Sequence, residues 1–269
     1  MTTPSHPADP GRRLLMSLPL SLPLAMAAPP LAAAPLAAAT SASTTTTPPA
    51  DGQQAAWATS GSITLQATLR HWLYLPQGYH EQRDQAWPLI VFLHGSGERG
   101  QDLHKVKAHG LPKLIAAGQS VPAIVVSPQC DDDLDWDPHL LHAMLLALRA
   151  QWRIDPRRVT ATGLSMGGGG CWDWATAYPD DLAGIAPVCG YGRSLRLARM
   201  RAVPVRAYHG AADTVVPLDA QQSLVRTLRE LGGQADLTVY PDVGHDAWNP
   251  AYADAGLVPW LLNRQRPTT

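Results

Sequence analysis

The sequence predicts an α/β fold whose mostly parallel sheet is covered by helices on both faces. Two observations lead to this prediction. Apolar runs such as WPLIVFL at residues 87–93 contain no polar residue, which is typical of strands that are buried on both faces. Longer helical patterns separate these runs and can return the chain for another parallel strand. We therefore expect one α/β domain over residues 57–265, without a large lid domain.

The expected elements alternate along this domain. Residues 63–75 predict one or two antiparallel strands. Later strands are expected in the short apolar runs 87–93, 123–127, 159–163, 182–188, 205–208 and 237–240. Helices are expected at about 138–152, 166–178, 219–231 and 250–263. Because the carboxyl ends of parallel strands share one edge of a sheet, we expect a functional site at that edge.

The composition fits a globular chain with a large core. Hydrophobic residues make up 45% and charged residues 16% of the 269 residues, which argues against global disorder. Lys plus Arg total 21 and Asp plus Glu total 22, so the formal net charge of −1 gives no footprint for nucleic acid. The three cysteines are too few and too scattered for a disulfide framework or a zinc ribbon.

The first 39 residues have the pattern of a cleaved signal peptide. Arg12 and Arg13 precede the apolar run 14–24, and small-x-small cleavage sites end at Ala27 and Ala39. Prolines interrupt every apolar run, so none reaches the roughly 18 apolar residues that a spanning helix needs. A lipid-facing anchor stays open as the alternative, and the arginine pair leaves open whether export uses the general or the twin-arginine route.

Residues 40–56 are rich in Ser, Thr, Pro and Ala and lack a periodic apolar face. Such a segment buries too little to offset its ordering entropy, so it predicts a flexible linker. We expect a periplasmic or secreted protein that has no stable membrane association after signal cleavage.

The strongest local motif is GLSMG at residues 163–167. It follows the expected strand at 159–163 and precedes the expected helix at 166–178, which is the setting of a nucleophile elbow. The flanking glycines suit a turn too sharp for side chains, and the helix N-terminus directs free N–H groups at the reacting centre. The motif therefore predicts Ser165 as a nucleophile, against the alternative of a glycine-rich turn with an incidental serine.

A serine hydroxyl needs a neighbouring base, and His245 is the candidate. It lies in the glycine-containing segment DVGHDAW after the last expected strand. Asp213 follows the preceding strand and reaches the same edge, where it can orient the imidazole. The chain order Ser165, Asp213, His245 is the order of the triad that accompanies such an elbow. Asp246 is the rival acid, although neighbours along a chain rarely face one another correctly.

The tetrahedral oxyanion of such a reaction requires preorganised N–H donors. The backbone N–H of Met166, directly after the nucleophile, is one expected donor. The other is expected from the HGSG segment after the strand at 87–93, with Ser96 favoured and Gly97 as the alternative. His94 starts this segment and is expected to support the loop rather than to act as a base.

Five motifs in the expected order resemble secreted α/β-hydrolase-fold serine esterases: FLHGSGERG, VSPQC, GLSMGG, HGAAD and GHDAW. The nearest group is the phospholipase/carboxylesterase-like "predicted peptidase" set, with polyhydroxybutyrate-depolymerase-like and feruloyl-type esterases as relatives. The resemblance covers residues 72–262. It implies the α/β-hydrolase fold and a serine hydrolase without metal or cofactor, in which Ser165, Asp213 and His245 are nucleophile, acid and base.

Other residues are weaker candidates. Trp136 and Trp248 lie in loops at the expected active edge and could line the substrate site, as could Gln129, with ordinary packing as the alternative for the tryptophans. The acidic run at residues 131–135 lacks the spacing of a calcium loop, so we expect a solvated loop and no metal site. A disulfide between Cys171 and Cys189 is conceivable after export.

The sequence thus predicts an exported hydrolase that cleaves carboxylic esters of small-molecule or polymer-derived substrates through an acyl-enzyme. The short connection at residues 189–204 has no long apolar face for a lid, so short-chain or bulky soluble esters are expected. Two alternatives stay open. A serine peptidase could use the same triad, and a carbohydrate- or polymer-binding module could carry a vestigial one.

Overall fold

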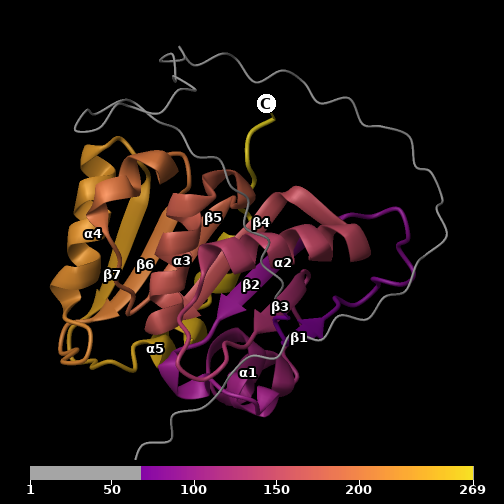
Figure 1. Cartoon of the computed structure of the whole chain (residues 1–269), viewed down its shortest axis with the longest axis horizontal. Coiled ribbons are helices and arrows are strands. Elements are labelled where there is room, and N and C mark those ends of the chain that lie inside the picture. Colours follow the sequence, from indigo (N-terminus) through magenta and orange to yellow (C-terminus); the bar gives the residue numbers. More distant parts are fainter. Residues whose placement is uncertain (1–67, 269) are drawn as a thin grey trace, which may run out of the picture. The chain divides into compact units, whose positions relative to one another are not determined.

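The computed structural model describes residues 68–268 (Figure 1). The expected signal peptide at residues 1–39, the expected linker at 40–56 and the first residues of the expected domain lie outside this part. Among the helices of residues 68–268, none combines the length and the apolar character needed to cross a bilayer.

A seven-stranded sheet organises the described residues, with strand order β1-β3-β2-β4-β5-β6-β7. Strand β1 runs antiparallel to β3, and every other neighbouring pair is parallel. The bounds are β1 (His71–Tyr74), β2 (Trp87–Leu93), β3 (Ile124–Pro128), β4 (Ile154–Leu164), β5 (Gly184–Val188), β6 (Val205–Gly210) and β7 (Ala235–Tyr240). The prediction of a mostly parallel sheet is therefore confirmed.

Helices cover both faces of the sheet, which explains the uninterrupted apolar strands. In β2, Leu89, Val91 and Leu93 belong to a core that includes side chains of α2, α3 and α4. Ile90 and Phe92 face the opposite core, which includes side chains of α1, α5 and α6. Figure 1 shows α2 and α3 over the near face. The bounds are α1 (Gly110–Ala116), α2 (Pro138–Gln151), α3 (Met166–Ala177), α4 (Leu218–Glu230), α5 (Trp248–Ala253) and α6 (Leu257–Leu262).

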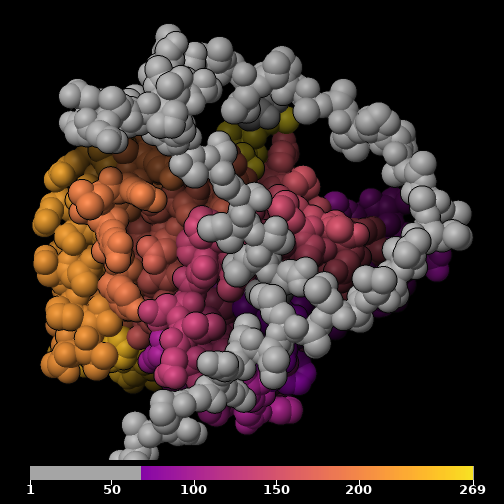
Figure 2. All heavy atoms as spheres, viewed as in Figure 1, coloured from indigo at the N-terminus to yellow at the C-terminus, as the bar shows by residue number. Residues whose placement is uncertain are grey.

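In Figure 2, the orange part of the chain, which follows residue 200, lies next to the salmon part that precedes it. The expected single helix over residues 250–263 is wrong, because α5 ends at Ala253 and α6 starts at Leu257. At the break, the Asp254 side chain accepts a hydrogen bond from the N–H of Gly256 over 2.8 Å. A polar side chain that bonds the nearby backbone competes with helix continuation.

Short 3-10 helices, which the sequence did not predict, occupy several connections: η1 (Ser96–Glu98), η2 (Leu103–Ala108), η3 (Pro179–Asp181) and η4 (Ser194–Met200). The helix η4 is the regular structure in the connection from β5 to β6, at residues 189–204. This connection is as short as expected and contains no lid domain.

Candidate active site

Ser165 lies at the sharp turn between β4 and α3. Its backbone has φ of 52° and ψ of −117°, a conformation that a non-glycine residue adopts only when its surroundings impose it. The Ser165 N–H donates to the carbonyl of Val188 over 2.9 Å. A Cβ atom on Gly163 would lie 2.6 Å from the carbonyl oxygen of Leu93, and one on Gly167 would overlap the same oxygen. The two glycines of the motif therefore allow the close approach that holds the elbow.

The structure brings the three expected triad residues together. The Nε2 atom of His245 lies 2.9 Å from the hydroxyl oxygen of Ser165. Its Nδ1 atom lies 2.8 Å from Oδ2 of Asp213. Because a carboxylate only accepts hydrogen bonds, Nδ1 carries the proton and Nε2 presents its lone pair to the serine. This is the arrangement in which an imidazole can take the hydroxyl proton.

The environment of Asp213 keeps its carboxylate charged. Burial acts to raise its pKa, but hydrogen bonds from His245, Val216 and Val215 outweigh burial and hold the pKa below its usual value. The two backbone N–H groups each lie 2.9 Å from Oδ1. The rival Asp246 is exposed and accepts a hydrogen bond from the Asn249 side chain instead. The geometry thus pairs His245 with Asp213.

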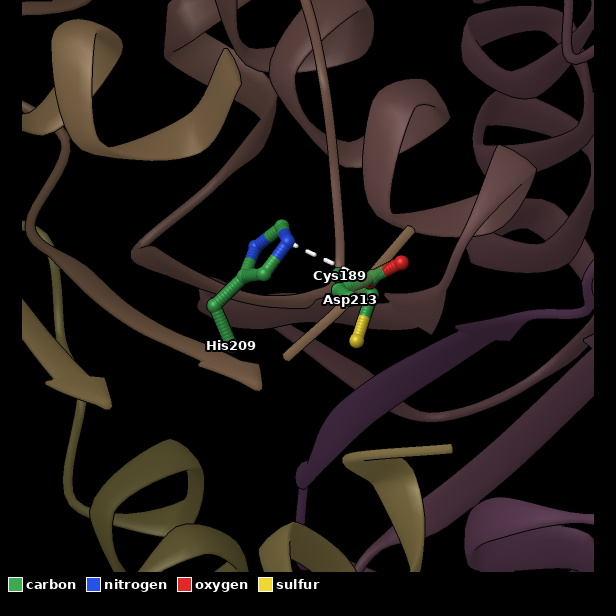
Figure 3. Close-up of side chains that lie close together, drawn as sticks. All are labelled: Cys189, His209 and Asp213. Carbon is green, nitrogen blue, oxygen red and sulfur yellow. Dashed lines mark ion pairs between the residues drawn. The ribbon is translucent and has the colours of Figure 1, made fainter. Parts of the chain in front are cut away.

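The triad acid Asp213 also lies next to Cys189 and His209. The possible metal-ligand atoms of these three residues lie within 4.8 Å of one another (Figure 3). The His209 Nε2 atom lies 2.9 Å from the carbonyl oxygen of Val216 and 3.3 Å from Oδ2 of Asp213. The Cys189 thiol donates to the carbonyl of His245, and burial raises its pKa to about 12, so it stays protonated. These contacts are better explained as support for the loop that carries Asp213 than as metal ligation, because cysteine binds a metal as the thiolate.

The expected oxyanion donors lie at the start of α3 and in η1. Met166 is the first residue of α3, where the backbone N–H has no intrahelical acceptor. Ser96 and Gly97 lie in η1, are exposed, and their N–H groups have no protein acceptor within residues 68–268. The close approach of Gly167 to the end of β2 brings this loop to the start of α3. The roles of Met166 and Ser96 stay predictions.

His94 supports this loop from below. It is fully buried, and burial lowers its pKa to about 4, so the imidazole is neutral at ordinary pH. Its Nδ1 atom donates to the carbonyl of Gly95 over 2.6 Å, and its Nε2 atom accepts from the N–H of Cys130 over 3.0 Å. Both ring nitrogens are engaged, which agrees with the expected structural role.

Two of the candidate substrate-lining residues donate hydrogen bonds to carbonyls in and next to the same loop. Gln129 is 2% exposed, and its side-chain amide donates to the carbonyls of Glu98 and Asp102 over 2.8 and 2.7 Å. Trp136 is 5% exposed and donates its indole N–H to the carbonyl of His94 over 3.0 Å. These contacts give both side chains a structural role in the loop, and their expected place in the lining of the substrate site stays a prediction.

Trp248, the third candidate, lies beside the triad and is partly buried. Its ring meets that of His245 edge-on, with centroids 5.3 Å apart. It also lies 5.4 Å from the ring of His109. Trp248 is thus in place to form a wall next to the imidazole.

The remaining weak candidates resolve simply. All three cysteines are free and buried, so the conceivable Cys171–Cys189 disulfide is not formed. Residues 131–135 are exposed as expected, and Asp131 and Asp135 face Arg70 and Arg99.

Two residues near the site had no assigned role in the sequence analysis. His209 contacts Asp213, and the Glu98 side chain contacts the Gly95 N–H. Both lie inside motifs that the sequence shares with esterases, HGAAD and FLHGSGERG, and that position was the available signal.

Comparison with known proteins points to the same group of enzymes. The Dienelactone hydrolase family matches residues 125–255, a range that holds Ser165, Asp213 and His245. A 110-residue segment is 29% identical to a Salmonella typhimurium protein named as a carboxymethylenebutenolidase, and covers 36% of this chain and 39% of that protein. A 145-residue segment is 30% identical to a Nocardia uniformis protein named as an esterase, NocK, and covers 49% and 42%. The matches span less than half of either relative.

A solved structure extends the comparison to most of the described domain. A thermostable esterase is 28% identical in sequence, with a TM-score of 0.65 over 74% of this chain and 60% of that one. The parallel sheet, the elbow after β4 and these matches all indicate the same fold. The chain has the α/β-hydrolase fold and is similar to esterase-type α/β hydrolases.

Proposed function

We propose that this protein is an exported serine hydrolase that cleaves carboxylic esters through an acyl-enzyme. One observation carries the proposal: a single imidazole, that of His245, lies 2.9 Å from the Ser165 hydroxyl and 2.8 Å from the Asp213 carboxylate. A hydroxyl at a strained turn, an oriented imidazole base and a buried carboxylate are the parts of an activated nucleophile.

The reaction follows from this geometry. His245 takes the Ser165 proton as the serine oxygen attacks the ester carbonyl carbon. The N–H groups of Met166 and Ser96 stabilise the oxyanion, a contribution of about 3 kcal/mol for one such donor. The imidazolium, held by Asp213, then protonates the departing alcohol. Water repeats the cycle on the acyl-enzyme and releases the acid.

A labelling and turnover experiment tests the proposal. A fluorophosphonate probe should label the purified protein, and peptide mapping should find the adduct on Ser165. A substrate panel of soluble esters, a butenolide and peptide amides should show turnover of esters. Ser165→Ala is the matched control and should lose both signals. Labelling without ester turnover, or turnover of amides alone, would overturn the esterase proposal.

The proposed substrates are short-chain or bulky soluble esters. Support comes from the short β5–β6 connection, whose η4 carries Arg196 and Arg199 and buries Leu197 and Met200 against the core. This segment offers no long apolar face to cover a lipid chain. With p-nitrophenyl esters, kcat/KM should fall beyond about eight acyl carbons, because additional methylenes, worth roughly 0.8 kcal/mol each if buried, find no pocket. Rising activity up to palmitoyl esters, with activation by emulsified substrate, would contradict this.

Export is proposed from the pattern of the first 39 residues. The mature protein should begin between Ala28 and Asp51 and should be recovered outside the cytoplasm. N-terminal sequencing of natively expressed protein tests this, and a retained Met1 in membrane-bound protein would favour an anchor.

A further inference from the structure

We infer that Glu98 is a positioning residue of the oxyanion loop, defined as residues 94–98. Its carboxylate holds the start of the loop so that the Ser96 N–H faces the reacting carbonyl oxygen. The inference rests on the proposed function, because positioning an oxyanion donor matters only if Ser165 forms a tetrahedral intermediate.

The contacts of Glu98 fasten both ends of a short turn. Its Oε2 atom accepts the N–H of Gly95 over 2.9 Å. Its own N–H donates to the carbonyl of Gly95 over 3.3 Å, and its carbonyl accepts from the Gln129 side chain over 2.8 Å. The residue is 9% exposed. A carboxylate withdrawn this far from water requires hydrogen-bond donors, and the Gly95 N–H supplies one.

The exposed part of the turn, Ser96 and Gly97, is confined less by packing than its ends are. Gly95 and Gly97 flank Ser96, and glycine has the largest conformational freedom of any residue. A Cβ atom on Gly97 would meet nothing within 4 Å, so packing does not confine that residue. The internal backbone hydrogen bond, at 3.3 Å, lies beyond the usual N–H···O range. Oxyanion donors contribute fully only when they are preorganised, and we therefore assign that task to the Glu98 carboxylate.

The neighbouring charges do not compete for this carboxylate at close range. Arg99, the next residue, pairs with Asp135 on the adjacent loop. The imidazole of His109 contacts the other carboxylate oxygen, with its Nε2 atom 3.9 Å from Oε1. The Gly95 N–H is therefore the hydrogen-bond donor to Oε2. Because the Arg99–Asp135 ion pair is separate from the Glu98–Gly95 hydrogen bond, each can be removed alone, and Asp135→Asn serves as a matched control.

Four variants test the inference: Glu98→Ala, Glu98→Gln, Glu98→Asp and the control Asp135→Asn. Turnover of p-nitrophenyl acetate and inhibition by an arylboronic acid, which forms a tetrahedral adduct on the serine, are measured for each. Glu98→Ala should reduce kcat on the order of 10- to 100-fold with little change in KM. A misplaced Ser96 N–H would stabilise the oxyanion little better than a missing one. The inhibition constant of the arylboronic acid for this variant should rise by the same factor as kcat falls. Glu98→Gln keeps an acceptor oxygen and should recover most of the kcat.

The aspartate variant separates positioning from charge. Asp keeps the negative charge but is one methylene too short to reach Gly95, so it should resemble Glu98→Ala. Asp135→Asn removes the ion pair of Arg99, the residue that follows the oxyanion loop, and should stay near wild type. If Glu98→Ala fails to fold by circular dichroism, the Asp and Gln variants decide.

The outcomes distinguish this inference from the proposed function. If the wild-type protein neither takes up the fluorophosphonate label nor turns over esters, the proposed function fails. If the wild type does both and Glu98→Asp keeps wild-type kcat and boronate affinity, the positioning role of Glu98 is wrong. An equal loss in Asp135→Asn would also overturn it, because the effect would then be general loosening of the loop.

Discussion

The nucleophile elbow and the oxyanion loop lie side by side at the carboxyl edge of the sheet, but different forces shape them. At the elbow, backbone packs on backbone, and the motif glycines Gly163 and Gly167 allow the chain to approach the end of β2. In the oxyanion loop, buried side chains hold the backbone. His94, Glu98 and Gln129 each bond a main-chain group of that region.

The elbow is shaped by residues that are neighbours in the sequence, whereas the oxyanion loop is also shaped by residues that are distant in the sequence. An elbow that depends on glycines within five residues can be recognised from those residues alone. A loop that depends on partners such as Trp136, which lies 42 residues from the His94 carbonyl it binds, is completed only when the chain folds. The four predictions below act on one region or the other.

The largest effect is expected at the elbow and its partners. Ser165→Ala or His245→Ala should reduce kcat on the order of 10⁴-fold or more while the fold is retained, because triad members act as a unit. Asp213→Asn should also be severely impaired, and Asp246→Asn should stay near wild type as its matched control. Steady-state kinetics with a soluble ester measures all four. A crippled Asp246→Asn beside a healthy Asp213→Asn would reverse the assignment of the acid.

A pair of glycine substitutions compares the two regions directly. Gly167→Ala places a Cβ atom onto the carbonyl oxygen of Leu93, where only backbone could move, so it should cost more than about 3 kcal/mol of unfolding free energy or prevent folding. Gly97→Ala meets open space and should change stability by less than about 1 kcal/mol. Urea denaturation measures both, and equal costs would contradict the distinction.

The oxyanion loop should also respond to acid through His94. Burial lowers the His94 pKa in the folded protein to about 4, while an unfolded histidine titrates near 6.5. The unfolded state therefore binds more protons between these values, so the His94 contribution to the unfolding free energy falls as pH falls from about 6.5 to about 4. The loss should reach about 3 kcal/mol at most. His94→Gln should flatten this dependence in urea titrations at pH 4.5, 5.5 and 7, and an unchanged slope would count against it.

The smallest effect is expected from the tryptophan that braces the loop. Trp136→Phe removes the indole donor and leaves the buried His94 carbonyl unpaired, which should cost about 1 to 3 kcal/mol. Its KM for a soluble ester should change little, since the ring is buried. Trp248→Phe, beside His245, is the comparison and should alter KM more than stability. Thermal denaturation and steady-state kinetics on both variants measure this, and a raised KM in Trp136→Phe alone would assign a substrate-lining role to Trp136.

Most of the sheet could be predicted from the sequence because continuous apolar runs need no distant information. The strand at residues 87–93 has the predicted bounds, and the chain order of Ser165, Asp213 and His245 predicted their meeting at one edge. The break between α5 and α6 escaped prediction because it depends on one side-chain contact of Asp254. The extent to which Gln129 and Trp136 are buried escaped prediction because exposure at a sheet edge is set by neighbouring loops, not by position along the chain.

The three buried thiols have a practical consequence. Burial raises the pKa of Cys130 and of Cys189 to about 12, and it raises that of the fully buried Cys171 as well. At neutral pH, a thiol with a pKa near 12 is ionised in only about one molecule in 10⁵, and maleimides react with the thiolate. A cysteine introduced by Leu195→Cys, at a position that is 93% exposed on η4, would then be the fast-reacting thiol of the protein. The native chain is thus already suited to attachment of a single fluorophore or to oriented immobilisation, with no cysteine to remove first.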